Sequence, residues 1–291
     1  MKTLIVGILL LTMACISNAQ LQTNRIVFDG LLREYFVFLP QNFEPDMPVV
    51  INLHGSGSDD AQWLMNYTLM NNVADTAGFI AVYPQSLPPR WNANCSIPGI
   101  SEPNVDDVGF ISALIDTLKM HYAIDMDRIY CCGLNYGGWM ASELICQIGN
   151  RFAAGARVNT SLGDSQAARC KLTRPFPMIL FNGTADTYLP WPDGKTGVMG
   201  GEEAIQWWVE RNGCSLDPDT LALPDLDATD NCTVEKISYL SGAGNVEVIF
   251  YKVINGGLSW PGAVGNETFD RPRNMDINAG VEIWNFLKRF E

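Results

Sequence analysis

Short apolar runs that alternate with helical patterns are the feature that most limits what this chain can fold into. Six such runs are present, and most end close to a Gly or a Pro: residues 48–53, 78–83, 128–132, 152–158, 177–181 and 246–254. Continuously apolar strands that are joined by helices are typical of parallel sheets, whose two faces are both buried. The pattern therefore predicts an α/β fold, with a mostly parallel central sheet and helices on both faces.

Helical signals between the runs agree with that fold. Apolar residues recur at helical spacing through residues 108–118, after Asp106 or Asp107, either of which can cap the helix. A last helix is expected around residues 277–287. Because no linker interrupts the pattern, residues 20–291 are predicted to form one domain.

The composition removes several classes of function. Lys and Arg total 19 against 32 for Asp and Glu, which gives a net charge of −13. Nucleic-acid binding requires a basic surface, so a nucleic-acid partner is not expected. Beyond the N-terminal residues no stretch reaches the ~20 apolar residues that span a bilayer, so no transmembrane segment is expected. The chain has two His and no cysteine spacing typical of zinc, so neither a metal nor another cofactor is expected.

Residues 1–19 have the three parts of a secretory signal peptide. A basic start is followed by an apolar stretch at residues 4–14 and by small residues just before Gln20. The protein is therefore expected to be secreted or periplasmic. A lipoprotein anchor at Cys15 is the less favoured alternative, because Thr12 stands where such a signal has Leu.

Export favours disulfides for the seven cysteines that follow this segment. Cys214 and Cys232 bracket an acidic, Pro-containing stretch, which predicts a loop closed by a disulfide. Cys146 and Cys170 are a second candidate pair. Seven is an odd number, so at least one thiol stays unpaired. The pairing of the other three is left open: Cys95, Cys131 and Cys132.

Three strand ends carry the residues from which a hydrolase site is built. Residues 133–138 (GLNYGG) follow a strand and open a helix, which is the setting of a nucleophile elbow of the G-x-S-x-G type. Residues 183–186 (GTAD) follow the strand at 177–181, and residues 256–262 (GGLSWPG) follow the last strand. The order nucleophile, acid, base along the chain is that of α/β-hydrolases.

With these motifs the chain resembles secreted polyhydroxybutyrate depolymerase-like esterases, which are close to the LpqC-type feruloyl and acetylxylan esterases. The matching segments cover almost all of the chain beyond the signal: residues 53–57, 105–111, 125–138, 181–186, 212–214 and 256–262. The resemblance implies a single α/β-hydrolase domain and a serine-esterase activity of the EC 3.1.1 type. It also implies that the cleft takes a polyester, a carbohydrate or an aromatic ester.

Two of the three catalytic positions depart from the family pattern. Asn135 stands at the nucleophile position in place of Ser, and Leu258 stands at the base position in place of His. Asp186 is the retained acid. A carboxamide cannot replace the serine hydroxyl as a nucleophile, and a Leu side chain can neither accept nor donate a proton. We therefore expect a pseudoenzyme that has lost hydrolysis but keeps a binding cleft.

An oxyanion-type pocket is expected to survive this loss. The resemblance places His54, Gly55 and Ser56 on the oxyanion-hole loop. The backbone N–H of Tyr136 would supply a second donor to the same pocket.

Four tryptophans fall on predicted loops around these positions. Trp91 and Trp260, together with Trp63 and Trp191, are expected at the rim of the cleft, where they would suit a sugar face or an aromatic acyl group. Packing between loops is an equally good interpretation for each of them.

An active carboxylic-ester hydrolase with a different set of groups is the alternative function. In that case His54 would act as the base, with Ser56 or Ser259 as the nucleophile. The second histidine, His121, lies near a predicted helix end and far from the three motifs in sequence.

Overall fold

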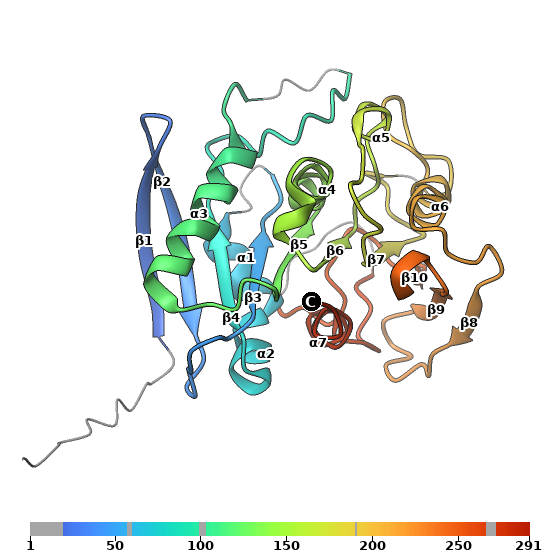
Figure 1. The fold of residues 1–291 in the computed structure, drawn as a ribbon. Coiled ribbons are helices and arrows are strands. Elements are labelled where there is room, and N and C mark those ends of the chain that lie inside the picture. The colour runs from blue at the N-terminus through green and yellow to red at the C-terminus, as the bar shows by residue number, and fades with distance from the viewer. Residues whose placement is uncertain (1–19, 57–59, 99–102, 190, 266–271) are drawn as a thin grey trace, which may run out of the picture.

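The computed structural model describes residues 20–56, 60–98, 103–189, 191–265 and 272–291. The predicted signal peptide, with Cys15, lies outside these residues. They form a ten-stranded sheet in the order β1-β2-β4-β3-β5-β6-β7-β10-β9-β8 (Figure 1). The strands are β1 Gln20–Phe28, β2 Leu31–Leu39, β3 Val49–Leu53, β4 Ile80–Pro84, β5 Ile129–Leu134, β6 Ala154–Val158, β7 Met178–Gly183, β8 Asp219–Ala222, β9 Thr233–Tyr239 and β10 Val248–Ile254.

The six central strands confirm the predicted α/β fold. Strands β4, β3, β5, β6, β7 and β10 run parallel to one another, whereas β1, β2, β9 and β8 add antiparallel pairs at the two edges. The parallel strands β3 to β7 are buried at every position, because helices cover both faces. The edge strands β8 and β9 are more polar, and for that reason the apolar pattern of the sequence missed them.

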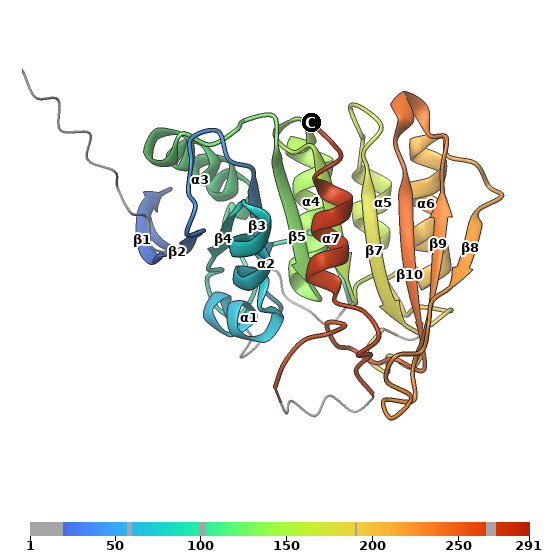
Figure 2. The same ribbon diagram turned by 90° about the horizontal axis from the view of Figure 1, so that it is seen from below.

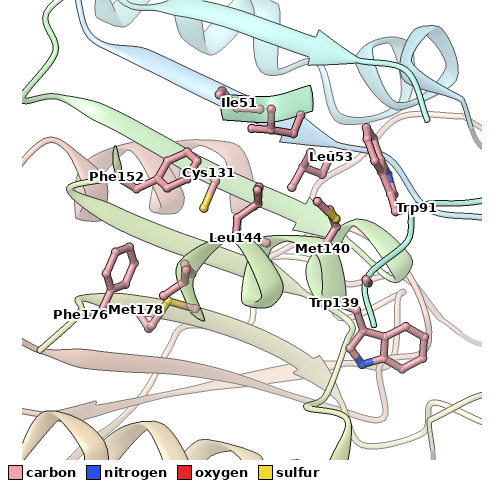
Figure 3. Packing of buried hydrophobic residues seen from close by; sticks show 14 of the residues in the cluster. Ile51, Leu53, Trp91, Cys131, Trp139, Met140, Leu144, Phe152, Phe176 and Met178 are labelled. Atoms are coloured by element: carbon pink, nitrogen blue, oxygen red, sulfur yellow. The ribbon is translucent and has the colours of Figure 1, made fainter. Parts of the chain in front are cut away.

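Helices lie on both sides of the sheet (Figure 2). They are α1 Ala61–Thr68, α2 Met70–Ala77, α3 Asp107–Tyr122, α4 Tyr136–Ile148, α5 Asp164–Arg169, α6 Gly201–Asn212 and α7 Ala279–Leu287, with 3-10 turns at Gly149–Arg151 and Ala243–Asn245. Helices α3 to α6 pack on one face, around the cluster seen in Figure 3. Helices α1, α2 and α7 pack on the other face, around a second cluster.

The two candidate capping residues at the start of α3 have different partners. Asp106 is the cap, because its Oδ1 accepts a hydrogen bond from the backbone N–H of Gly109 at 2.8 Å. Asp107 instead forms a buried ion pair with Arg33 of β2, in which Nη2 and Oδ1 lie 2.5 Å apart. Helix α3 is thereby tied to the antiparallel edge of the sheet.

The predicted disulfide between Cys214 and Cys232 is wrong. Both thiols are free and buried. Cys214 packs in the cluster on the α3–α6 face of the sheet, whereas Cys232 packs in the cluster on the α7 face. Cys214 Sγ lies 3.7 Å from the carbonyl oxygen of Val246, just before β10, whereas Cys232 precedes Thr233, which pairs with Ile254 at the other end of β10. The length of β10 therefore separates the two cysteines, whose Cα atoms would have to lie within about 7 Å of each other in a disulfide.

The acidic stretch between these cysteines is held without a covalent bond. Four of its residues form β8, which pairs with β9 at the edge of the sheet. Asp276 Oδ1 then accepts the backbone N–H groups of Leu226 and Asp227 at 2.7 and 3.0 Å. Backbone pairing and these charge-assisted hydrogen bonds hold the stretch in place, a role that was expected of a disulfide.

The other candidate pair, Cys146 and Cys170, forms a disulfide with a Cα–Cα distance of 4.9 Å. It joins the last turn of α4 to the residue after α5. Cys131 and Cys132 have free, buried thiols, and Cys95 is buried as well.

Replacement of Cys146 and Cys170 by Ala is expected to lower the free energy of unfolding by about 2–4 kcal/mol, because the disulfide restricts the unfolded chain. Denaturant titration of the purified variant measures this loss. Peptide mapping without reduction should link Cys146 to Cys170 and leave Cys214 and Cys232 open to alkylation after unfolding. A peptide that joins Cys214 to Cys232 would contradict the structure.

Candidate active site

The turn from β5 into α4 has the backbone of a nucleophile elbow, with Asn135 at its apex. Asn135 has φ 52° and ψ −116°, and Asn adopts a positive φ more readily than most other residues. Gly137 sits where a Cβ would collide with the carbonyl of Leu53, and Gly133 sits where a Cβ would collide with Gly137. The close approach of β3, β5 and α4 therefore requires both glycines.

The side chain of Asn135 bends back to the adjacent backbone. It is buried, and its Oδ1 accepts the backbone N–H of Tyr136 at 2.8 Å. That N–H is the donor that the sequence assigned to the oxyanion pocket. In this structure the donor is already used by the carboxamide.

Asp186 follows β7 and is buried with only one of its two oxygens satisfied. Oδ1 accepts the backbone N–H groups of Tyr188 and Leu189 at 2.7 and 2.9 Å. Oδ2 has no hydrogen-bond partner among the described residues. Burial raises the pKa of the Asp186 carboxyl, while the two N–H groups and the charge of Lys195 oppose the shift.

The loop after β10 carries half-buried Leu258 to the same edge of the sheet. Its neighbour Ser259 accepts a hydrogen bond at its backbone oxygen from Asn159 Nδ2. Gly256 accepts the backbone N–H of Ala185 at 2.9 Å, which joins the β10 loop to the loop of Asp186.

Asn159 is a positioning residue that the sequence analysis missed. It follows β6 with φ 45°, and its Oδ1 accepts the backbone N–H of Gly183 at 3.2 Å. One side chain thus links the ends of β6, β7 and β10. The only signal in the sequence was an Asn directly after a strand, a place where that residue often adopts positive φ.

The three predicted catalytic positions therefore lie on adjacent loops. The backbone N–H of Asn135 donates to Val158 at the end of β6, next to Asn159, at 3.0 Å. Because β5, β6, β7 and β10 are parallel neighbours, their carboxyl ends meet at one edge of the sheet. That the Asn135, Asp186 and Leu258 side chains share one cleft remains our prediction.

His54 is buried, and both of its ring nitrogens are engaged. Nε2 accepts the backbone N–H of Ser86 at 3.0 Å and lies 3.2 Å from Gln85 Nε2. The proton is therefore on Nδ1, which lies 3.0 Å from the carbonyl oxygen of Gly55. In this arrangement His54 is a structural residue that fixes the loops after β3 and β4 together.

The two tryptophans assigned to the binding set are buried, which corrects their expected place at a rim. Trp91 donates its Nε1 hydrogen to the carbonyl of His54 at 3.0 Å and is 0% exposed, and Trp260 is 2% exposed in the α7-face cluster. Both pack loops against the sheet, as large aromatic side chains do when they are fully covered. Trp63 stacks on Tyr67 and Trp191 on Phe250, and both are half-buried.

Tyr136 is also buried, with its ring edge-on to Trp139. Its hydroxyl accepts a hydrogen bond from Arg90 Nη1 at 3.3 Å. Burial raises the pKa of Tyr136 to about 12, and the nearby Arg90 opposes that shift. The side chain is therefore a neutral packing group at neutral pH.

Other parts of the molecule offer no metal centre in the described ranges, where no group of three or more His, Cys, Asp and Glu side chains is placed to hold an ion. Two surface cavities of ≈ 400 and ≈ 410 Å³ lie away from the elbow, one beside the start of α3 and one between β9, β10 and α7. None of the helices in the described residues is long and apolar enough to cross a membrane.

Asp186→Asn is expected to stabilise the protein at neutral pH. The folded-state pKa of Asp186 is raised above the ordinary value, so the native state holds the proton more tightly than the unfolded chain. The stabilisation of the native state that comes from this tighter proton binding is fully present below the unfolded pKa near ~4, and it is lost as the pH rises through the folded pKa. Removal of the charge should therefore gain about 1–3 kcal/mol at pH 7 and little at pH 3.

Thermal unfolding of both proteins from pH 3 to pH 8 measures this difference. Exposed Asp217, whose carboxylate carries no described side-chain contact, provides the control Asp217→Asn. A gain for Asp186→Asn that does not vary with pH would contradict the expected origin.

Fold and site together define an α/β-hydrolase: a mostly parallel sheet, a strand–elbow–helix turn, and an acid after a later strand. Comparison with known proteins then gives the relatives. The chain is 31% identical over 160 residues to a bifunctional acetylxylan esterase/xylanase from Neocallimastix patriciarum, and the matched region covers 55% of this chain and 22% of that protein. It is 27% identical over 201 residues to feruloyl esterase B from Piromyces equi, and that match covers 64% of this chain and 37% of the other protein.

A poly(3-hydroxyalkanoate) depolymerase from Paucimonas lemoignei is 24% identical over 217 residues, with 72% of this chain and 49% of that protein covered. Among solved structures, acetyl xylan esterase from Aspergillus awamori has a TM-score of 0.63 at 15% identity and covers 92% of this chain and 99% of that one, a likeness of fold. No protein-family model matches. The chain is a homologue of feruloyl and acetylxylan esterases and of a polyhydroxyalkanoate depolymerase, and it spans well under half of the first two relatives.

Proposed function

We propose that this chain is a catalytically degenerate member of the esterase group, which keeps the fold and a ligand site but has lost serine-esterase chemistry. Asn135 is the observation that carries the proposal. It stands at the apex of the elbow, offers a carboxamide in place of a hydroxyl, and its Oδ1 takes the Tyr136 N–H. One residue thus removes the nucleophile and uses one donor of the oxyanion pocket.

The base side of the site supports the same proposal. Leu258 has no atom that can move a proton, and the Oδ2 of Asp186 is without a partner in the described structure. In a working triad the carboxylate orients an imidazole and stabilises the imidazolium that forms. Here the acid is kept and the group that it would orient is gone.

An active hydrolase that uses His54 as its base is the competing function. A general base needs an available lone pair within hydrogen-bond reach of the proton that it abstracts. In the neutral His54 ring only Nε2 has a lone pair that can accept a proton, and this nitrogen already accepts the Ser86 N–H. The contacts of His54 therefore favour the loss of hydrolysis over a rebuilt catalytic set.

Hydrolysis assays on the unmodified protein test the proposal directly. We expect no turnover of p-nitrophenyl acetate, methyl ferulate or a hydroxybutyrate oligomer above the rate in buffer, and no labelling by a fluorophosphonate. Robust hydrolysis that survives Asp186→Ala and is lost in His54→Ala would refute the proposal and support the alternative set.

The ligand class of the site is proposed from the relatives. Their names cover acetylxylan, feruloyl and poly(3-hydroxyalkanoate) esters, so a polyester, carbohydrate or aromatic ester is the expected ligand. Calorimetric titration with methyl ferulate, acetylated xylo-oligosaccharide and hydroxybutyrate trimer compares the three classes. Absence of heat for all three would leave the fold as a scaffold without this binding role.

Export is proposed as well, with residues 1–19 as a cleaved signal and residues 20–291 as the mature domain. The Cys146–Cys170 disulfide supports this, because such bonds persist in oxidising compartments. Mass spectrometry of the protein from the culture medium or periplasm should find Gln20 at its N-terminus. A lipid-modified Cys15 would favour the membrane-anchored alternative.

A further inference from the structure

Arg157 of β6 carries a positive charge into the middle of the protein. Its side chain is 1% exposed and contacts α4 and α6. These two helices lie on the same side of the sheet (Figure 1). Nη1 donates to the hydroxyl of Ser142 on α4 at 3.1 Å and to the carbonyl of Ser161 at 3.0 Å. The guanidinium carbon lies 5.5 Å from the ring centroid of Trp208 on α6.

The charge of Arg157 meets no carboxylate in the described residues. It takes part in none of their ion pairs. Glu143, the buried acid next to Ser142, directs its carboxylate to Asn94 Nδ2 at 3.0 Å, to Gln147 Nε2 and to Arg169. Burial lowers the pKa of Arg157 to about 9.

Two N–H groups at this place also have no acceptor in the described structure. They are Nε of Arg157 and Nε1 of Trp208, the indole over which the guanidinium lies. Buried donors are nearly always satisfied, and a buried charge is costly unless a counter-charge accompanies it. The hydroxyl, carbonyl and ring that do face Arg157 are all neutral.

We infer that Arg157 and Trp208 form a binding site for a small monovalent anion, of which chloride is the simplest example. A single anion would accept from the unpartnered Nε and supply the missing negative charge at the same time. A water molecule could accept the hydrogen bonds but would leave the charge uncompensated.

The anion would also hold part of the candidate active site in place. Arg157 donates to the carbonyl of Ser161, in the loop that begins with Asn159. Asn159 in turn holds the backbone of Ser259, beside Leu258. The proposal does not depend on whether the protein hydrolyses esters, because it concerns the order of this loop.

Thermal unfolding of the mature protein in chloride tests the site. Chloride replaces methanesulfonate at constant ionic strength, so that screening does not change. Binding to the native state alone should raise the melting temperature by about 2–4 °C for each tenfold rise in chloride above its dissociation constant. Crystals grown in bromide should show an anomalous peak within hydrogen-bond reach of Arg157 Nε.

Two variants complete the test. Arg157→Met should lose both the chloride dependence and the bromide peak. Arg211→Met should keep both, since exposed Arg211 lies over Trp207 on the same helix, 4.8 Å from its ring centroid. If Arg157→Met does not fold, the unmodified protein decides alone. Absence of either the chloride dependence or the bromide peak overturns the proposal and leaves a water molecule or the Trp208 ring as the only compensation.

Discussion

Asn135→Ser combined with Leu258→His is expected to create esterase activity at least ~100-fold above that of either single variant, because a positioned general base contributes about 10²–10⁴ in rate. Asn135→Ser supplies the hydroxyl and, by removing the carboxamide oxygen, releases the Tyr136 N–H for an oxyanion. If the predicted cleft is correct, Leu258→His puts an imidazole beside Asp186, whose Oδ2 has no partner in the described residues and can accept the Nδ1 hydrogen. Initial rates with p-nitrophenyl acetate measure the gain.

The single variants and a triple variant are the controls. Asn135→Ser alone has a hydroxyl without a base, and Leu258→His alone has a base with nothing to activate, so each should stay near background. Addition of Asp186→Asn to the double variant should remove most of the gain, since the imidazole then loses its orienting carboxylate. Gains that are simply additive would show that the two positions do not act on one reaction.

The new activity is expected to fall well short of that of an intact esterase. The surrounding loops have not been held to catalytic geometry, and a displacement of ~1 Å can remove ~100-fold in rate. Labelling of the double variant by a fluorophosphonate at residue 135 is the more sensitive measurement. Absence of both labelling and turnover would mean that the three side chains do not share one cleft.

Arg33→Met is expected to cost about 3–5 kcal/mol of unfolding free energy, which corresponds to a fall of about 6–15 °C in melting temperature. The ion pair of Arg33 with Asp107 is buried, with side-chain exposures of 1% and 0%. Its guanidinium also stacks 3.8 Å from the ring centroid of Phe110. Without Arg33 the carboxylate of Asp107 stays buried with no cation, and that uncompensated charge produces the loss.

Denaturant titration measures the change, and two further variants identify its cause. Arg33→Met with Asp107→Asn should recover most of the stability, because no charge is then left in the core. Arg25→Met breaks the exposed pair between Arg25 and Glu34 and should cost less than about 1 kcal/mol. A loss at Arg33 that Asp107→Asn does not relieve would point to packing on Phe110 rather than to charge.

The central sheet could be predicted because strands that are buried on both faces are largely apolar. Strands β3 and β5 are buried at every position, and the sequence shows them as runs that are apolar apart from Asn52 in β3. The elbow was predictable for a similar reason, since Gly133 and Gly137 stand where no Cβ fits. Strand β8 is exposed at all four of its residues and left no such pattern.

Side-chain partnerships could not be predicted, because they depend on contacts between distant parts of the chain. The pairing of Cys214 with Cys232 was inferred from the acidic stretch that they bracket, but the two thiols pack in different clusters, on opposite faces of the sheet. For Trp91 a place at the rim and packing between loops were equally good interpretations, and the structure decides for packing, because its indole N–H donates to the His54 carbonyl in the interior. Sequence spacing says little about which face of a sheet a loop residue finally reaches.

The sequence by itself determined the fold class, the elbow and the identity of the residues at the catalytic positions. Those features follow from local chemistry: apolar runs, obligatory glycines, and an Asn and a Leu that cannot do the work of Ser and His. Only the tertiary structure decided which acceptors the hydrogen-bond donors find and which charges have a partner. It gives the Tyr136 N–H to Asn135, leaves Asp186 Oδ2 without a partner in the described residues, and buries Arg157 beside neutral groups. Hydrogen bonds and charge compensation depend on three-dimensional neighbours, which no spacing along the chain specifies.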